Sequence, residues 1–149
     1  MLFSPVPFFS RFLFSGTGII SLVFVFFLAL APSKTYSQDT DALANEITTA
    51  IEQGSARELA RFFGPNVDLT LPGSEGTFSK SQAEMILRTF FSRNVPESFS
   101  TNHQGSSRDG SVYIIGTLTT QNEQSFRTYI LIKRVSDNYF LHQLQFEER

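Results

Sequence analysis

The sequence predicts an α+β domain in which three N-terminal helices pack on a curved antiparallel sheet of about four to five strands. Helix-like hydrophobic spacing appears in residues 39–63 and 79–93, and strand-like segments fill residues 98–147. Short turn motifs separate these strands, so consecutive strands should pair antiparallel. The helices must then cover one face of the sheet.

The first 37 residues have the pattern of a secretory signal peptide. Arg11 and the amino terminus give a weakly positive start, and an uncharged apolar run extends from Gly18 to Ala31. Cleavage after Ser37 is favoured over cleavage after Ala31, because a proline directly follows Ala31. The alternative is that the segment is not cleaved and anchors the chain in a membrane. We expect contact with a membrane only in that case.

Residues 38–149 are long enough for one hydrophobic core and too short for two domains. The chain has no cysteine, so it forms no disulfide and has no thiol chemistry. An exported domain of this kind suits the periplasm of a Gram-negative bacterium. Removal of the signal peptide takes Arg11 and Lys34 from the 12 basic residues and leaves 10, against 14 acidic residues. The resulting net charge of −4 does not favour binding to nucleic acid.

Two helices are expected at the start of the domain. The first ends at Gly54 and carries apolar residues at helical spacing: Leu43, Ile47, Ala50 and Ile51. The second begins at a capping box of Ser55 and Glu58, has its apolar side at Leu59, Phe62 and Phe63, and stops at Gly64-Pro65.

A short strand and a third helix follow. Residues 66–71 alternate between apolar and polar until Pro72-Gly73, and the segment "GSEGTF" is interpreted as a turn. A capping box of Ser79 and Gln82 opens the third helix, which ends near Arg93. Its apolar positions keep a helical period: Ala83, Ile86, Leu87, Phe90 and Phe91.

The remaining residues predict four consecutive strands. Their expected bounds are Ser98–Gln104, Ser111–Gln121, Ser125–Val135 and Asn138–Glu147. Turn-forming residues separate them: Gly105 to Gly110, Asn122-Glu123 and Asp137-Asn138.

Four segments carry a resemblance to a known family: "AIEQGSARELARFF", "SKSQAEMILRTFF", "HQGSSRDGSVYIIGTLTT" and "FRTYILIKR". They resemble a family of small exported bacterial proteins of unknown function. The element order resembles the cone-shaped nuclear transport factor 2-like (cystatin-like) superfamily, which includes ketosteroid isomerases, scytalone dehydratase and polyketide cyclases. The resemblance implies a cone with a possible pocket between helices and sheet, and relatives that often dimerise through their sheets.

Side-chain alternation within the strands gives candidates for a pocket. Phe140, His142, Leu144 and Phe146 share one parity, and Thr128 shares the corresponding parity of the preceding strand. We expect this parity to face the helices, with His142 and Thr128 orienting a small apolar or amphipathic ligand. His103 shares parity with Phe99 and Thr101 and is a weaker candidate at the pocket mouth.

The opposite parity gives candidates for an interface. It carries Tyr113, Tyr129 and Tyr139 together with Ile115, Leu131 and Leu141, which is too apolar for a face left in water. A homodimer or another protein partner should cover this face, because tyrosines are enriched at interfaces.

These patterns favour a non-catalytic binding module for a small ligand or a protein. An isomerase or lyase of the ketosteroid isomerase kind is the main alternative, with Asp68, His103 or His142 as its base. A structural module that docks a protein through the tyrosine-rich face is the second alternative. We assign no catalytic residue, and the two histidines have no metal-binding spacing, so neither a metal nor another cofactor is expected.

Overall fold

The structure, a computed structural model, describes residues 37–149. Nearly all of the expected signal peptide therefore lies outside the described residues. The order of elements is α2 (Ser37–Glu52), α3 (Ala56–Ala60), β1 (Phe63–Leu71), β2 (Ser74–Ser79), α4 (Lys80–Arg93), β3 (Pro96–Ser106), β4 (Val112–Thr120), β5 (Ser125–Val135) and β6 (Asn138–Glu148). Within residues 37–149, no helix is both long enough and apolar enough to cross a bilayer.

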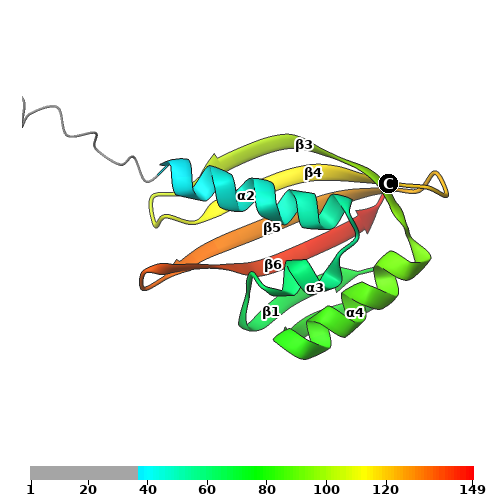
Figure 1. The fold of residues 1–149 in the computed structure, drawn as a ribbon, viewed down its shortest axis with the longest axis horizontal. Coiled ribbons are helices and arrows are strands. Elements are labelled where there is room, and N and C mark those ends of the chain that lie inside the picture. The colour runs from blue at the N-terminus through cyan, green and yellow to red at the C-terminus, as the bar shows by residue number, and fades with distance from the viewer. Residues whose placement is uncertain (1–36) are drawn as a thin grey trace, which may run out of the picture. The chain divides into compact units, whose positions relative to one another are not determined.

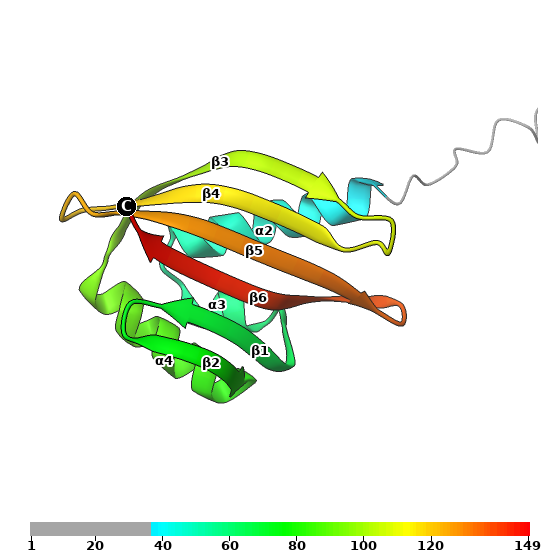
Figure 2. The same cartoon turned by 180° about the vertical axis from the view of Figure 1, so that it is seen from behind.

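The strands form one curved sheet of six strands in the order β2-β1-β6-β5-β4-β3, with the helices on one side (Figures 1 and 2). This confirms the α+β class and corrects the expected count of four to five strands. The pairings are antiparallel except between β1 and β6, which run parallel. The helices are not all N-terminal, because the β1–β2 hairpin precedes α4.

The additional strand is β2, which covers most of the segment "GSEGTF", so the prediction of a turn over this whole segment is wrong. It pairs with β1 from Asn66–Ser79 to Leu71–Ser74, and the turn itself is reduced to Pro72 and Gly73. Gly73 has φ +79°, a left-handed conformation that favours glycine. A short edge strand buries few of its side chains, so the sequence carries no alternation to reveal it.

The second helix is shorter than the sequence predicts. It ends at Ala60, and Phe63 is the first residue of β1 instead of a helical residue. Gly64 and Pro65 likewise lie within β1 and do not form a stop. The chain is held at this point by the Leu141 backbone N–H, which donates to the Phe62 carbonyl over 2.7 Å.

Side-chain caps position the two helices that follow α2. The Ser55 hydroxyl accepts a hydrogen bond from the Glu58 backbone N–H at 3.3 Å and begins α3. The Ser79 backbone N–H donates to Gln82 Oε1 at 3.1 Å at the start of α4, as the predicted capping box requires. The apolar side of α4 is thereby directed at the sheet, where Ala83, Leu87, Phe90 and Phe91 are buried.

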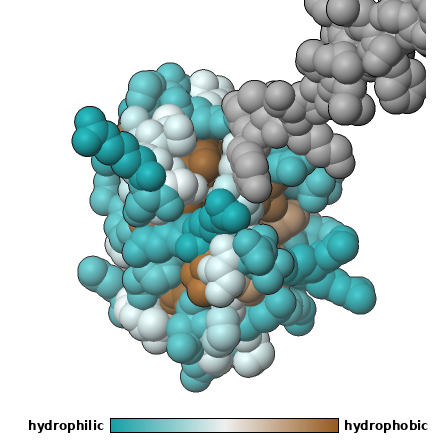
Figure 3. All heavy atoms as spheres, turned by 90° about the vertical axis from the view of Figure 1, so that its left-hand side faces the viewer, coloured by the Kyte–Doolittle hydropathy of each residue, from teal (hydrophilic) through white to brown (hydrophobic). Residues whose placement is uncertain are grey.

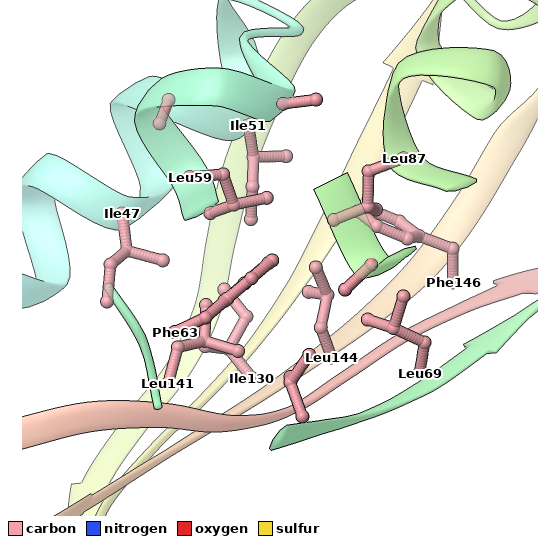
Figure 4. Packing of buried hydrophobic residues seen from close by; sticks show 14 of the residues in the cluster. Ile47, Ile51, Leu59, Phe63, Leu69, Leu87, Ile130, Leu141, Leu144 and Phe146 are labelled. Carbon is pink, nitrogen blue, oxygen red and sulfur yellow. The ribbon is translucent and has the colours of Figure 1, made fainter. Parts of the chain in front are cut away.

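A cluster of four phenylalanines fills the space between α4 and the sheet. The Phe90 ring stacks on Phe146 with centroids 4.9 Å apart and meets Phe126 edge-on at 5.2 Å. Phe91 adds edge-on contacts to Phe90 and Phe146. Each such ring pair contributes about 0.5–1.5 kcal/mol beyond the burial of apolar area. Aliphatic residues from α2, α3, β1 and β6 continue the core beside this cluster (Figure 4).

Several register shifts interrupt the pairing of the strands, and two of them decide on which face candidate side chains lie. In β3 the irregularity falls at Asn102, between the pair Thr101–Gly116 and the pair His103–Ile115. In β6 it falls at His142, between the pair Leu131–Gln143 and the pair Ile132–Leu141. An extra residue in one strand moves the side chains beyond it to the other face and increases the local twist.

The close packing of β3 on β4 gives a test of this arrangement. A Cβ added at Gly116 would lie 2.3 Å from a Phe99 ring atom and 2.8 Å from the Ser100 carbonyl oxygen. We expect Gly116→Ala to lower the free energy of unfolding by about 1–3 kcal/mol, as measured by urea denaturation.

The matched control is Thr119→Ala, on the other face of β4, which should cost less. Phe99→Ala should relieve part of the Gly116→Ala penalty in the double variant, because it removes the closest ring atom. Strictly additive costs would contradict the contact between Phe99 and Gly116.

Candidate functional site

Thr128 lies in the core and does not line an open pocket. Its side chain faces the helices as predicted, but the residue is 0% exposed. Its hydroxyl donates to the Phe126 carbonyl at 3.4 Å, a long hydrogen bond. The phenylalanine cluster occupies the space in which a ligand would contact this hydroxyl.

His142 lies at the bulge of β6, so the prediction that places it among apolar core side chains is wrong. Its side chain is 43% exposed, and its Nε2 lies 3.9 Å from Oδ2 of Asp68. The Thr77 hydroxyl on β2 donates to the other carboxylate oxygen of Asp68 at 2.6 Å. The three residues form an open polar cluster on the uncovered side of the sheet.

His103 also lies on the uncovered side, because the bulge at Asn102 reverses its expected parity. The residue is exposed, and its Nε2 lies 3.1 Å from the hydroxyl oxygen of Tyr113 on β4. The Tyr113 ring covers Gly105, where a Cβ would come within 2.4 Å of the tyrosine hydroxyl. His103 therefore helps to fix Tyr113 on the sheet surface and does not line a pocket mouth between helices and sheet.

Four apolar or aromatic side chains form a contiguous group on the uncovered side. Tyr113 lies opposite Leu131, and Ile115 lies opposite Tyr129, in consecutive outward positions of the β4–β5 ladder. All four are half-buried, whereas the residues between them face the core. We call this group, made of Tyr113, Ile115, Tyr129 and Leu131, the outer-face block. No described helix covers this side (Figure 2).

Polar residues surround the outer-face block. Gln143 and Gln145 of β6 lie opposite Leu131 and Tyr129. Arg127, the next outward residue of β5, pairs with Glu147 at 3.4 Å. An apolar centre with a polar rim is the usual arrangement of a protein interface.

Tyr139 does not belong to the outer-face block, which corrects the sequence prediction. The bulge at His142 places Tyr139 and Leu141 on the helix side, where Leu141 is fully buried and Tyr139 packs against the core. Phe140 takes the outward position instead and lies against Gly64.

A surface groove that the sequence did not indicate lies between α4, the β1–β2 turn and the end of β6. It has a volume of about 460 Å³, within the usual range of small-molecule sites. Leu71 and Phe90 contribute its buried apolar part, and Arg93 and Glu148 contribute its charges. These residues are distant in the sequence and form no motif, so only the fold brings them together.

The lining residues place the groove at the last turns of α4 and beside Glu148. Figures 1 and 2 show that α4 finishes at the end of the domain where the C-terminus lies. Figure 3 shows the opposite end, where α2 begins. Apolar side chains appear there only as small separate patches between polar ones.

Shifted pKa values do not mark either surface as catalytic. The Ser111 backbone N–H and hydroxyl donate to Asp109 and lower the pKa of its carboxyl group. The Glu58 carboxylate raises the pKa of the Arg61 guanidinium. Both groups stabilise local turns of the chain. Within residues 37–149, no three His, Asp or Glu side chains are close enough to hold a metal ion.

The chain is similar to a family of unknown function. A family model described as a domain of unknown function (DUF4783) matches residues 44–147. A DUF4783 family protein from Bacteroides ovatus is 33% identical, with a TM-score of 0.65 over 70% of this chain and 93% of that chain. One from Bacteroides fragilis is 35% identical, with a TM-score of 0.64 over 70% of this chain and 96% of that chain.

A more distant similarity concerns the fold alone. An NTF-2 like protein of unknown function from Silicibacter pomeroyi is 12% identical, with a TM-score of 0.55 over 77% of this chain and 99% of that chain. The expected nuclear transport factor 2-like fold is thereby confirmed. No curated protein is significantly similar to this chain.

The position of Thr128 can be tested by two substitutions. Thr128→Val should change the free energy of unfolding by less than about 1 kcal/mol, because the hydroxyl makes only one long hydrogen bond. Thr128→Ala should cost more, because it leaves a cavity. If thermal denaturation shows Thr128→Val to be as costly as Thr128→Ala, the hydroxyl has a role that this packing does not explain.

Proposed function

This chain belongs to the DUF4783 family of domains of unknown function, and on that premise we propose that it is a non-catalytic binding module that docks a protein through the outer-face block. The observation that supports the proposal is the contrast between the two sides of the sheet. Large side chains fill the helix side, whereas the other side presents the four half-buried apolar or aromatic residues of the outer-face block. A second copy of the chain is the simplest partner, since a two-fold axis would place two such blocks face to face.

The composition of the outer-face block supports a protein as the partner. Tyrosines bury large areas and keep a polar tip, so they suit surfaces that are wet before binding and partly wet afterwards. The hydroxyl of Tyr113 is already oriented by His103, which lowers the entropy lost on docking. The ion pair between Arg127 and Glu147 lies at the rim, where it contributes more to orientation than to affinity.

Catalysis has less support from the geometry. The cluster of Asp68, Thr77 and His142 contains a candidate base, but Asp68 and His142 are each 43% exposed. An isomerase of this fold class would need an apolar enclosure to shift the pKa of its base and to exclude water. The 460 Å³ groove contains none of these three residues.

We also propose export to the periplasm, which rests on the sequence of residues 1–37 alone. Edman sequencing of the protein from its own cells should begin at Gln38. A protein that starts at Met1 and sediments with membranes would instead identify the segment as an uncleaved anchor.

The docking proposal predicts the effect of a charge within the outer-face block. Leu131→Lys should weaken the complex by about 10- to 100-fold, because a buried apolar contact is replaced by a charge that must be desolvated. Native mass spectrometry of the protein purified from its own cells would report the mass of a dimer or of a complex with a partner.

The matched control is Val135→Lys on the same strand, because Val135 is 57% exposed and lies outside the block. The proposal requires Leu131→Lys to reduce the complex and Val135→Lys to preserve it. A monomer without any partner in the unsubstituted protein would refute the proposal.

A further inference from the structure

The 460 Å³ groove has an apolar part that requires no large rearrangement to accept a ligand. Leu71 and Phe90 are 6% and 7% exposed and therefore form a fixed apolar surface. Met85 borders them and is 66% exposed, which makes it one of the most exposed large apolar side chains of the described residues. A methionine in this position adapts to the shape of an apolar ligand because its side chain has three rotatable bonds.

Two opposite charges line the same groove. Arg93 lies in the last turn of α4, and Glu148 is the last residue of β6. Within residues 37–149, neither side chain makes an ion pair, whereas Arg88 of the same helix pairs with Glu84. The groove therefore presents a guanidinium and a carboxylate that do not neutralise each other.

We infer that the groove binds a zwitterion with an apolar body, of the class of an apolar amino acid or a short apolar peptide. The ligand carboxylate would lie at Arg93, its ammonium group at Glu148, and its side chain against Leu71 and Phe90. An apolar anion such as a fatty acid would pair with Arg93 and leave Glu148 without a partner, and an apolar cation would pair with Glu148 and leave Arg93 without one. A ligand that carries both charges satisfies both residues.

This inference is independent of the docking proposal. The groove lies on the helix side, while the outer-face block lies on the other side of the sheet. Leu131→Lys should therefore leave ligand binding to the groove unchanged. A negative result for protein docking would not overturn ligand binding, and a negative result for ligand binding would not overturn protein docking.

Titration calorimetry of the purified full-length protein tests the inference with capped and uncapped ligands. The probes are leucine, N-acetyl-leucine and leucine amide, followed by the dipeptide Leu-Leu and its two capped forms. The uncapped form should bind about tenfold more tightly than either capped form, which is the usual loss for one charge-assisted hydrogen bond. Comparison of leucine with Leu-Leu then distinguishes a free amino acid from a peptide.

Two substitutions assign the charges to their residues. Arg93→Gln should abolish the preference for a free carboxylate, and Glu148→Gln should abolish the preference for a free amino group. Arg88→Gln and Glu97→Gln are matched controls, because these residues are exposed and lie outside the groove. Thermal denaturation of each variant separates a loss of binding from a loss of folding.

The calorimetry results for the six probes and the four variants either support or overturn the proposed binding of a zwitterion. The inference is supported if uncapped ligands bind best and each substitution removes the preference for one charge. It is overturned if no probe binds in the millimolar range, if capped forms bind equally well, or if Arg93→Gln and Glu148→Gln bind as the unsubstituted protein does.

Discussion

The stacking of Phe90 on Phe146, with Phe91 and Phe126 around them, is the interaction on which the rest of the structure depends. It attaches α4 to the middle of the sheet and fills the space in which a cone of this kind would hold a ligand. Thr128, at the same level of β5, is consequently a core residue whose hydroxyl donates to the Phe126 carbonyl. The two proposed recognition surfaces therefore both lie on the outside of the domain. The outer-face block and the groove beside α4 are the two surfaces that have suitable chemistry.

The two surfaces differ in the kind of partner that they fit. The outer-face block lies on two paired strands, and the hydroxyl groups of Tyr113 and Tyr129 make it partly polar. It therefore suits the flat surface of another protein. The groove is concave and bordered by opposite charges at the end of α4, so it suits a small molecule. Because the sheet separates them, one domain could hold both partners at the same time. The shortest connection between the sites runs from Phe90, which lines the groove, to Phe126 on β5, the strand that carries Tyr129 and Leu131.

Much of the fold could be predicted from the sequence, since turn residues and hydrophobic periods record it locally. Ser125–Val135 is predicted with both bounds correct, and Asn138–Glu147 ends one residue before β6 does. The sequence could not reveal β2, whose exposed residues do not alternate, or the bulges at Asn102 and His142. A bulge depends on pairing with a distant strand, so it leaves no local signature. For this reason the faces assigned to His103, His142 and Tyr139 were wrong, whereas those of Tyr113, Tyr129 and Thr128 were correct.

The central claim is that a protein partner docks on the outer side of the sheet and not between the helices and the sheet. Hydroxyl-radical footprinting of Tyr113, Tyr129 and Tyr139 tests this claim most directly, with the native assembly compared with the dissociated protein. Oxidation of Tyr113 and Tyr129 should fall in the assembly, while oxidation of Tyr139, which packs against the core, should stay the same. Equal oxidation of Tyr113 and Tyr129 in both states, or protection confined to Tyr139, would contradict the account.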